Sequence, residues 1–505
     1  MSHIPSLPDD PELLKQMIRE LLEQLQSSRR HEEQLRFKLD LLTRKLFGRK
    51  SEKLDPNQLS LIDLEALGVP KTESPEIPEL PAEEPAAPRR QPKRRRPSKE
   101  LPRRRVEHTL SEAERLCPCC NIPMQPFREE LHEQLDYRPA VLEVIEHVRY
   151  VYACTRGCDE AVETAAKPPQ LIEKGLPGPG LLAHVVTCKY GDHLPLNRLE
   201  GIFRRLGASI ARSTLCDWVR ACAEAASPVV DALKTQALSS HVLATDDTSV
   251  CVLDAQQGSK KGRLWVYVGD EQHPVTVYDY TPTRAGEGPQ TFLEGYSGFL
   301  QADAYSAYDA LYQTGRITEL GCWMHCRRYF YEASQKDSGL PFEALAMIRE
   351  LYKVERECEK LAPDRRFERR RERSLKILDA FDQWIDSKAP AILPKSPLGK
   401  AFTYYINQRA ALRRYCDDGR FPIDNGRSER ALRPIAVGRN NWLFAGSDAG
   451  GQRAAILYSL IATCRRHKID PFRYLTDLFR QLPEHPRNQV HELTPLAWKQ
   501  RLTTA

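Results

Sequence analysis

The stretch VLATDDTSVCVL, residues 242–253, has the apolar composition of a buried β-strand, yet it contains the adjacent acids Asp246 and Asp247. Burying an unpaired carboxylate costs several kcal/mol, so an acid in such a strand requires a compensating charge. Successive side chains of a strand point to opposite faces, so only one of the two aspartates can join a given site. Periodicity does not choose between them. The other one faces away, toward solvent or a basic partner.

Two further strand-like runs, GRLWVYVGD and VTVYDYTP, follow this stretch and predict an antiparallel meander. Helix-like and strand-like runs then alternate through PQTFLEGY, GFLQADA and ITELGCWMHCRRYFYEA, which predicts a mixed sheet with helices on its faces. Asp303 ends the fourth strand, so it lies beside one of the aspartates if the first and fourth strands are neighbours. Paired carboxylates repel unless a cation neutralises them, and Mg²⁺ prefers such oxygen ligands.

A third acid is expected in FPIDNGRSERALRPIAVGRNNWLFAGSDAGG, residues 421–451, which offers Asp424 and Glu429. Glu429 lies at the start of a predicted helix. The helix dipole favours a carboxylate there even when no site is present. On spacing alone, this structural interpretation of Glu429 is the stronger one.

Length and composition indicate several soluble domains. The chain has 505 residues, of which 41% are hydrophobic and 29% charged, and this length favours more than one core. No apolar run is long enough to span a bilayer. The first residues lack the basic and apolar regions of a secretory signal. We therefore expect a cytoplasmic protein without a membrane partner.

Residues 10–54 carry a seam of apolar positions in alternating steps of four and three, which favours a coiled coil over a single packed amphipathic helix. Ser28 and Glu32 interrupt the seam and could set register or partner number. A homodimer or higher oligomer is the expected product. The seam comprises Leu14, Ile18, Leu21, Leu25, Ser28, Glu32, Leu35, Leu39, Leu42 and Leu46.

Residues 55–105 read as a linker that is acidic first and basic afterwards. Its last part, PRRQPKRRRPSKELPRRR, holds eight Arg, two Lys and one Glu, a larger positive charge than the +6 of the whole chain. Such a run is either a solvated linker or a phosphate-binding arm, and disordered arms order on DNA. The arginines taken as DNA contacts are Arg94, Arg95, Arg96, Arg103, Arg104 and Arg105.

Five of the 14 cysteines cluster between residues 117 and 158, which suits a structural Zn²⁺ site better than buried free thiols. Cys117 and Cys120 form one knuckle, with Cys119 as a spare or alternative ligand. Cys154 and Cys158 form the other, at a looser spacing. Four thiolates leave no open coordination position, so this zinc would be structural.

The segment LNRLEGIFRRLG, then ASI, then ARSTLCDWVRACAEA predicts a helix-turn-helix whose second helix ends near Ala225. Gly207 lies in the turn. Arg212, Ser213 and Thr214 lie near the start of the second helix, where recognition helices meet DNA. Taken alone, this pattern is a weak signal, because many helical hairpins share it.

Several passages together resemble the bacterial transposases of the insertion sequence 66 family, which are DDE transposases with a ribonuclease-H-like core. The passages are KLFGRKSEK, CPCC, YACTRGC, HLPLNRLEGIF, ATDDTSV, LQADAYSAYDAL, GCWMHCRRYF and IDNGRSERALRPIAVGRNNWLFAGSDAGG. They run from about residue 40 to the C-terminus. The second knuckle has one extra residue, and Asn-Gly replaces the commoner Asn-Asn before Glu429.

The resemblance implies that Asp246, Asp303 and Glu429 are the catalytic acids and hold Mg²⁺ or Mn²⁺. Asp247 then stands where a glutamate is more usual. Arg430 and Arg433, on the helix of Glu429, would contact phosphates near the scissile bond. Cys322 and His325 match a Cys-x-x-His motif, for which we favour a structural or DNA-adjacent role because a metal would need two further ligands.

The implied function is a transposase that binds terminal inverted repeats and target DNA and catalyses metal-dependent strand cleavage and transfer. Accessory proteins of the same element are possible partners. Two alternatives remain: a DNA-binding regulator without catalysis, and a metal nuclease without strand transfer. The regulator explains the residues before 225 but not the acids at strand ends.

The fold class expected is multidomain α+β and α/β. Its parts are the coiled coil 10–54, linker and arm 55–105, zinc-binding domain 106–170, helix-turn-helix domain 171–237, core 238–337, helical insertion 338–420, second core part 421–465 and C-terminal element 466–505. Basic clusters of the insertion, such as RRFERRRER, are either solvated or in contact with DNA.

Overall fold

A computed structural model describes residues 169–173, 175–254, 258–336 and 339–504, with the strands β1 Val151–Ala153 and β2 Val162–Thr164 and residues 16, 142 and 145. β1 and β2 pair in antiparallel fashion. The predicted coiled coil apart from Gln16, the basic arm and the four cysteine ligands lie outside the described residues.

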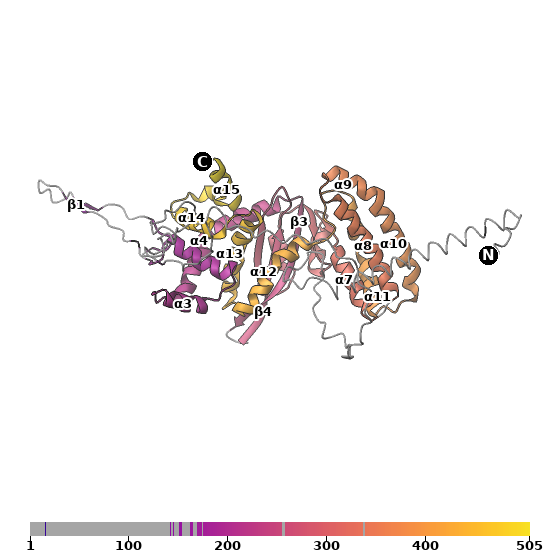
Figure 1. Ribbon diagram of the computed structural model, residues 1–505, viewed down its shortest axis with the longest axis horizontal. Helices are drawn as coiled ribbons and strands as arrows, with labels where there is room; N and C mark the ends of the chain where they lie inside the picture. Colours follow the sequence, from indigo (N-terminus) through magenta and orange to yellow (C-terminus); the bar gives the residue numbers. More distant parts are fainter. Residues whose placement is uncertain are drawn as a thin grey trace, which may run out of the picture. The chain divides into compact units, whose positions relative to one another are not determined.

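A five-stranded mixed sheet forms the centre of the fold (Figure 1). β3 Val242–Asp254, β4 Gly258–Val268 and β5 Thr276–Thr281 form the predicted antiparallel meander. β6 Gly298–Gln301 and β7 Ile317–Leu320 continue the sheet in parallel pairing, in the order β5-β4-β3-β6-β7. β3 therefore pairs with β6, so the condition under which Asp303 lies beside an aspartate of β3 is met.

The outer edge of β5 is closed by α13, Asp448–Arg466, which packs along it. The backbone N–H of Thr276 donates to Thr463 Oγ1 at 3.1 Å, and that of Tyr278 donates to Ser459 Oγ at 2.8 Å. The side chains of Ser459 and Thr463 are both fully buried. Side chains of a helix thus satisfy the strand edge, which would otherwise be open to pairing with another chain.

The other helices lie before, between and after the strands, and α12 runs across β3 and β4 in Figure 1. Within the described residues, no helix is long and apolar enough to cross a membrane. The α-helices are α2 Pro179–Val186, α3 Leu196–Arg205, α4 Arg212–Leu238, α5 Glu287–Phe292, α6 Asp309–Gln313, α7 Trp323–Ser334, α8 Leu340–Cys358, α9 Pro363–Arg369, α10 Leu375–Lys388, α11 Pro397–Arg413, α12 Gly426–Trp442, α14 Pro471–Gln481 and α15 Pro495–Thr504. Shorter 3₁₀ and π turns are η2 Thr187–Gly191, η3 Ser306–Tyr308, η4 Arg370–Ser374, η5 Ala389–Ala391, η6 Arg414–Cys416 and η7 Arg487–Leu493.

Helices α8 to α11 occupy the region predicted as a helical insertion and share an apolar core with α7 (Figure 1). Trp323, Phe330 and Phe381 are fully buried in this core. Trp323 Nε1 donates to the carbonyl of Leu412 at 2.8 Å, which ties α7 to α11. The helical character of the insertion is confirmed, and its boundaries stay predictions.

The predicted helix-turn-helix appears as α3, a turn and α4, with Gly207 in the turn at a φ of 89° that favours glycine. The predicted end of the second helix near Ala225 is wrong, because α4 continues to Leu238. Pro228 removes one helical N–H, but the buried Val229 and Leu233 extend the apolar face beyond it. Packing of this face against α13 outweighs the cost of an interior proline.

Candidate active site

The register between β3 and β6 brings two predicted acids to the same end of the sheet. Ala244 of β3 pairs with Gln301 of β6 in parallel alignment. Two residues further along each chain segment lie Asp246 and Asp303. The Asp303 carboxylate is close enough to raise the pKa of Asp246. Parallel pairing thus places the first two predicted acids side by side.

The third acid, Glu429, lies in the first turn of α12, as expected from the sequence. The buried Asn425, immediately before this helix, donates from Nδ2 to the carbonyl of Thr245 at 2.7 Å. Further along α12, Arg439 Nη1 donates to Thr248 Oγ1 at 3.2 Å. Contacts at both ends therefore hold α12 against β3. They bring the Glu429 carboxylate close enough to raise the pKa of Asp246.

Burial raises the pKa of all three carboxyl groups. Burial raises the pKa of Asp246 to about 7, with further contributions from the nearby charges of Asp303, Glu429 and Asp247. Burial also raises the pKa of Asp303 and of Glu429. Crowded acids with raised pKa values are typical of functional sites, and a bound cation would relieve their repulsion.

Two of these acids have basic neighbours that oppose the effect of burial. Arg284 Nη2 lies 3.8 Å from Asp303 Oδ2, and Arg328 Nη2 lies 3.3 Å from Glu429 Oε1. His325 Nε2 is 3.8 Å from the same Glu429 oxygen. Burial and the charge of Arg328 lower the pKa of His325 to about 4, so this imidazole is neutral near pH 7 and forms no ion pair with Glu429.

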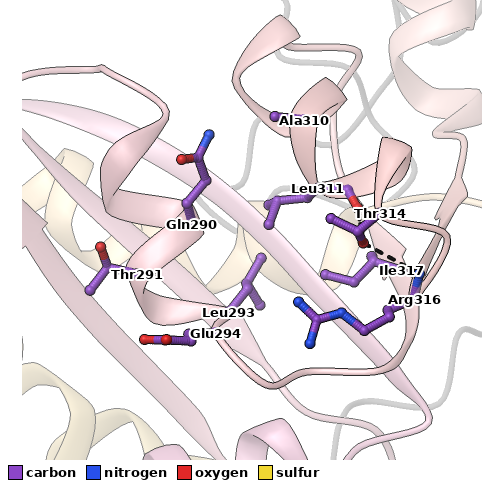
Figure 2. Close-up of a pocket in the computed structure, with 9 residues that line it drawn as sticks. All are labelled: Gln290, Thr291, Leu293, Glu294, Ala310, Leu311, Thr314, Arg316 and Ile317. Atoms are coloured by element: carbon purple, nitrogen blue, oxygen red, sulfur yellow. Dashed lines mark hydrogen bonds between the residues drawn. The ribbon is translucent and has the colours of Figure 1, made fainter.

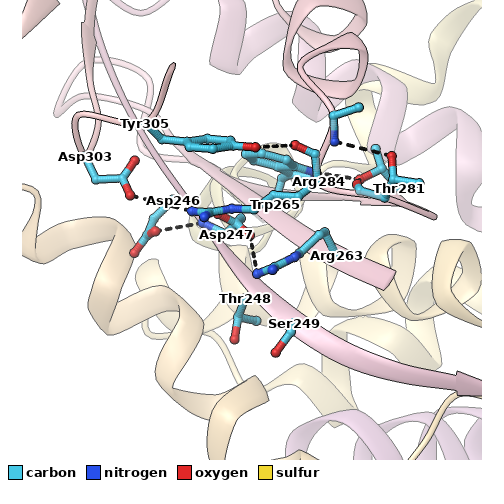
Figure 3. A network of polar contacts seen from close by, with 12 residues as sticks. Asp246, Asp247, Thr248, Ser249, Arg263, Trp265, Thr281, Arg284, Asp303 and Tyr305 are labelled. Atoms are coloured by element: carbon cyan, nitrogen blue, oxygen red, sulfur yellow. Dashed lines mark hydrogen bonds and ion pairs between the residues drawn. The ribbon is translucent and has the colours of Figure 1, made fainter. Parts of the chain in front are cut away.

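Asp247 lies on the other face of β3, and its side chain is only 3% exposed (Figure 3). Arg263 Nη1 donates to its Oδ2 at 2.9 Å, and Arg284 donates to its Oδ1 from Nε at 3.1 Å and from Nη2 at 2.9 Å. Of the two environments expected for Asp247, a basic partner is confirmed and exposure to solvent is wrong. Paired guanidinium groups compensate the charge of an acid in an apolar strand.

The donor set fits a hard divalent cation, because it consists of carboxylate oxygens whose mutual repulsion such an ion would relieve. In the described residues, however, no group of three His, Cys, Asp or Glu side chains already has the spacing of a metal centre. Glu429 is directed to Arg328 instead.

Asp424, the other acid of that stretch, has a structural role. Tyr352 donates its hydroxyl to Asp424 Oδ2 at 2.8 Å, and the N–H of Gly426 donates to Oδ1 at 2.9 Å. These bonds connect the start of α12 to α8. Both carboxylate oxygens are thus already used within the fold.

Both residues of the Cys-x-x-His motif contact the region of α12: Cys322 contacts Asn425, and His325 contacts Glu429. Cys322 is fully buried, burial raises its thiol pKa to about 12, and its Sγ accepts from the N–H of Asn425 at 3.2 Å. Cys326 is also a buried free thiol. Both favour the structural role expected for the cysteines, while His325 contacts Glu429.

The predicted DNA-contacting residues that the structure describes lie at the surface. Arg430 and Arg433 are exposed on α12, close in sequence to Glu429. Arg212 and Ser213 are exposed at the start of α4, and Thr214 is half-buried. Their positions are compatible with DNA contacts, which stay predictions.

Sequence reasoning missed Arg284 and Arg328, the basic partners of two predicted acids. A signal existed for Arg328, because it follows His325 by three residues and both therefore share one face of α7. Arg284 lies in the loop after β5 and had no local signal. Only the tertiary fold brings it to Asp303.

A separate surface pocket of about 410 Å³ lies between α5, α6 and the start of β7 (Figure 2). Its lining includes the charged side chains Glu294 and Arg316 and the apolar Leu293, Leu311 and Ile317. None of the three predicted acids lines it. It is therefore distinct from the candidate active site.

An Asp246→Asn variant should be more stable than the unaltered chain in magnesium-free buffer at pH 8, by about 1 to 3 kcal/mol after allowance for solvent screening. The folded pKa of about 7 exceeds the ordinary value of 3.8, so ionisation opposes folding. Stability linked to this group is present below about pH 4 and lost as the pH rises to about 7. Denaturant unfolding at pH 8 and pH 4.5 measures the difference, which should be much smaller at the lower pH because most of the penalty develops between pH 4.5 and pH 7. An equal gain at both values would contradict the assigned charge effect.

Comparison with protein-family models gives four matches. Residues 174–453 match the model described as Transposase IS66 family, and residues 459–496 match the IS66 C-terminal element. Residues 114–159 match the zinc-finger binding domain of transposase IS66. Residues 34–106 match the model described as Transposase C of IS166 homeodomain.

Three similar proteins come from Sinorhizobium fredii, and all bear the description uncharacterized. The protein y4hP is 32% identical over 498 residues, covering 92% of this chain and 88% of its own length. The protein y4qI is 31% identical, covering 78% and 76%. The protein y4jD is 29% identical, covering 79% and 81%.

Proposed function

Because this chain belongs to the transposase IS66 family, we propose that it cleaves and joins DNA strands at the ends of a mobile element, using divalent metal ions held by Asp246, Asp303 and Glu429. The family identifies a nucleic-acid-processing enzyme that binds DNA. The DDE mechanism, the metal ligands and the recognition of terminal inverted repeats are our proposal.

The observation that carries this proposal is that two acids from other segments, Asp303 and Glu429, both lie close enough to Asp246 to raise its pKa. Asp246 and Asp303 follow paired residues of neighbouring parallel strands, and α12 brings the charge of Glu429 close to Asp246. A non-enzymatic regulator gives no reason for this arrangement. The strand order β5-β4-β3-β6-β7, an antiparallel meander beside two parallel strands, supports a ribonuclease-H-like core.

Bound Mg²⁺ or Mn²⁺ supplies Lewis-acid activation of the attacking oxygen and stabilises charge on the leaving oxygen. Water first attacks the scissile phosphorus, the P–O3′ bond breaks, and a free 3′-hydroxyl remains. That hydroxyl then attacks a phosphodiester of the target strand, so one such bond forms as another breaks. The exposed Arg430 and Arg433 beside Glu429 contact phosphates of the reacting strand.

The remaining parts position the DNA. Arg212, Ser213 and Thr214 of the helix-turn-helix meet the terminal repeats, as does the basic arm around Arg94–Arg96 and Arg103–Arg105. Zn²⁺ on Cys117, Cys120, Cys154 and Cys158 stabilises the finger that the family model matches. The coiled coil joins two protomers, which pairing of two DNA ends requires, and accessory proteins of the element could join the complex.

Purified full-length protein should nick a linear duplex carrying the inverted repeats that flank its gene when Mg²⁺ or Mn²⁺ is added, and should not nick it without a divalent ion. Gel analysis of end-labelled strands measures the reaction. Precleaved ends with a free 3′-hydroxyl should also join to plasmid DNA. Cleavage without joining would favour the nuclease alternative, and cleavage in the absence of a divalent ion would contradict the mechanism.

A further inference from the structure

Arg284 is held in one orientation beside the candidate metal site (Figure 3). Its guanidinium donates twice to Asp247 Oδ1, and it lies over the ring of Tyr305 at 3.9 Å from the centroid. The Tyr305 hydroxyl donates to the carbonyl of Arg284 at 2.7 Å. Side chain and backbone are thus fixed together, so the guanidinium cannot move far from Asp303.

The charges around Asp247 do not cancel. Two guanidinium groups, from Arg263 and Arg284, share the single buried carboxylate of Asp247. One positive charge is left over. Of the two, Arg284 is the one that reaches toward Asp303, at 3.8 Å, and 38% of its side chain remains exposed. The surplus charge is therefore directed at one of the three crowded acids.

We propose that Arg284 is a positioning residue for Asp303, an internal counter-ion that holds this carboxylate before metal arrives and competes with the metal for it. Asp247 anchors the guanidinium and moderates its charge. The inference rests on the proposed function, because it takes Asp303 as a metal ligand. It also assigns a role to Asp247, the second of the two adjacent aspartates, which strand alternation alone leaves without one.

The proposal predicts opposite effects for the two partners of one ion pair. Arg284→Gln removes a positive charge from the site, so Mn²⁺ should bind about tenfold more tightly. Asp247→Asn removes a negative charge and frees Arg284 for Asp303, so Mn²⁺ should bind about tenfold more weakly. A merely structural pair would instead weaken the site in both variants.

The measurement is a titration of the full-length protein with Mn²⁺ in the absence of DNA, followed by electron paramagnetic resonance of the free ion. Arg263→Gln is the matched control, because it removes the same charge and an equal 2.9 Å contact to Asp247 without a contact to Asp303. Its effect should be clearly smaller than that of Arg284→Gln. Arg284→Lys keeps the charge but loses the double donation and the stacking on Tyr305, so any tightening should be clearly smaller than that of Arg284→Gln.

The Asp303→Asn variant distinguishes a failure of the proposed metal site from a failure of the role proposed for Arg284. If this variant binds Mn²⁺ as the unaltered chain does, Asp303 is no ligand and the proposed metal site fails. If it binds more weakly while Arg284→Gln shows no tightening, the metal site stands and the role of Arg284 is overturned. Equal effects of Arg263→Gln and Arg284→Gln, or tightening in Arg284→Lys as large as in Arg284→Gln, would also overturn it. Thermal unfolding without metal verifies that each variant is folded.

Discussion

A Glu429→Gln variant should lose strand cleavage by about 1000-fold or more while binding DNA like the unaltered chain. Metal ions contribute several kcal/mol of charge stabilisation in such reactions, and each 1.36 kcal/mol changes the rate tenfold. The amide keeps the size of Glu429 but removes the anionic oxygen that a metal needs. The DNA contacts that we propose are basic and hydroxyl side chains and do not include Glu429, so DNA binding should persist.

Asp424→Asn is the control for this variant, because Asp424 is the other acid that the same stretch offers. Its oxygens accept from Tyr352 and Gly426, so the change weakens the start of α12 without removing a metal ligand. Cleavage should fall much less than in Glu429→Gln. Single-turnover cleavage and fluorescence anisotropy of labelled DNA measure the two effects. Equal losses in both variants, or activity retained in Glu429→Gln, would remove Glu429 from the catalytic set.

Replacing Arg370 with methionine should lower the free energy of unfolding by about 3 to 5 kcal/mol, the usual cost of leaving a buried charge unpaired. Arg370 is 1% exposed and donates to Glu355 from Nε at 2.8 Å and from Nη2 at 2.6 Å. Its Nη1 donates to the carbonyls of Tyr415 and Asp418. This side chain thus connects α8 with the turn before Phe421.

Arg371→Met, at the next position, should cost no more than about 0.5 kcal/mol, because Arg371 is exposed. The double variant Arg370→Met with Glu355→Gln should be more stable than Arg370→Met alone, since no unpaired carboxylate remains. Urea unfolding followed by circular dichroism gives all three values. Similar costs at positions 370 and 371 would show that the buried pair contributes little.

Arg370 also shows how a charge run in a sequence can mislead. RRFERRRER reads as one basic cluster for solvent or DNA, but its members have different partners. Arg366 donates to three carbonyl groups, Arg373 pairs with Glu357, and Arg369 pairs with Glu372. Helical packing decides which arginine is buried, and no local pattern in the run reports it.

Strand alternation and the order of elements predicted the meander and the mixed sheet correctly. They could not choose between Asp246 and Asp247, because both faces of a central strand are covered. The register of β3 and β6 depends on pairing between segments more than 50 residues apart in the chain, as in Val242 with Phe299. Glu429 was selected by family resemblance, since its position near a helix start has an ordinary explanation.

The basic partners of the acids, Arg284 and Arg328, could not be predicted from the sequence, again because the paired residues are far apart in the chain. Arg284 and Asp247 are 37 positions apart, and Arg328 and Glu429 are 101 apart. Such pairs form only when the sheet, α7 and α12 are assembled. The extension of α4 beyond Ala225 likewise depends on tertiary packing, which overrides the local signal of Pro228.

The closure of β5 by α13 has a consequence for the time course of synthesis. Thr276 bonds to Thr463, which is 187 positions later. At usual rates of translation, roughly 10 to 40 s separate the appearance of the strand from that of the helix. During this interval the edge of β5 lacks the side chains that later satisfy it and is open to pairing with another chain.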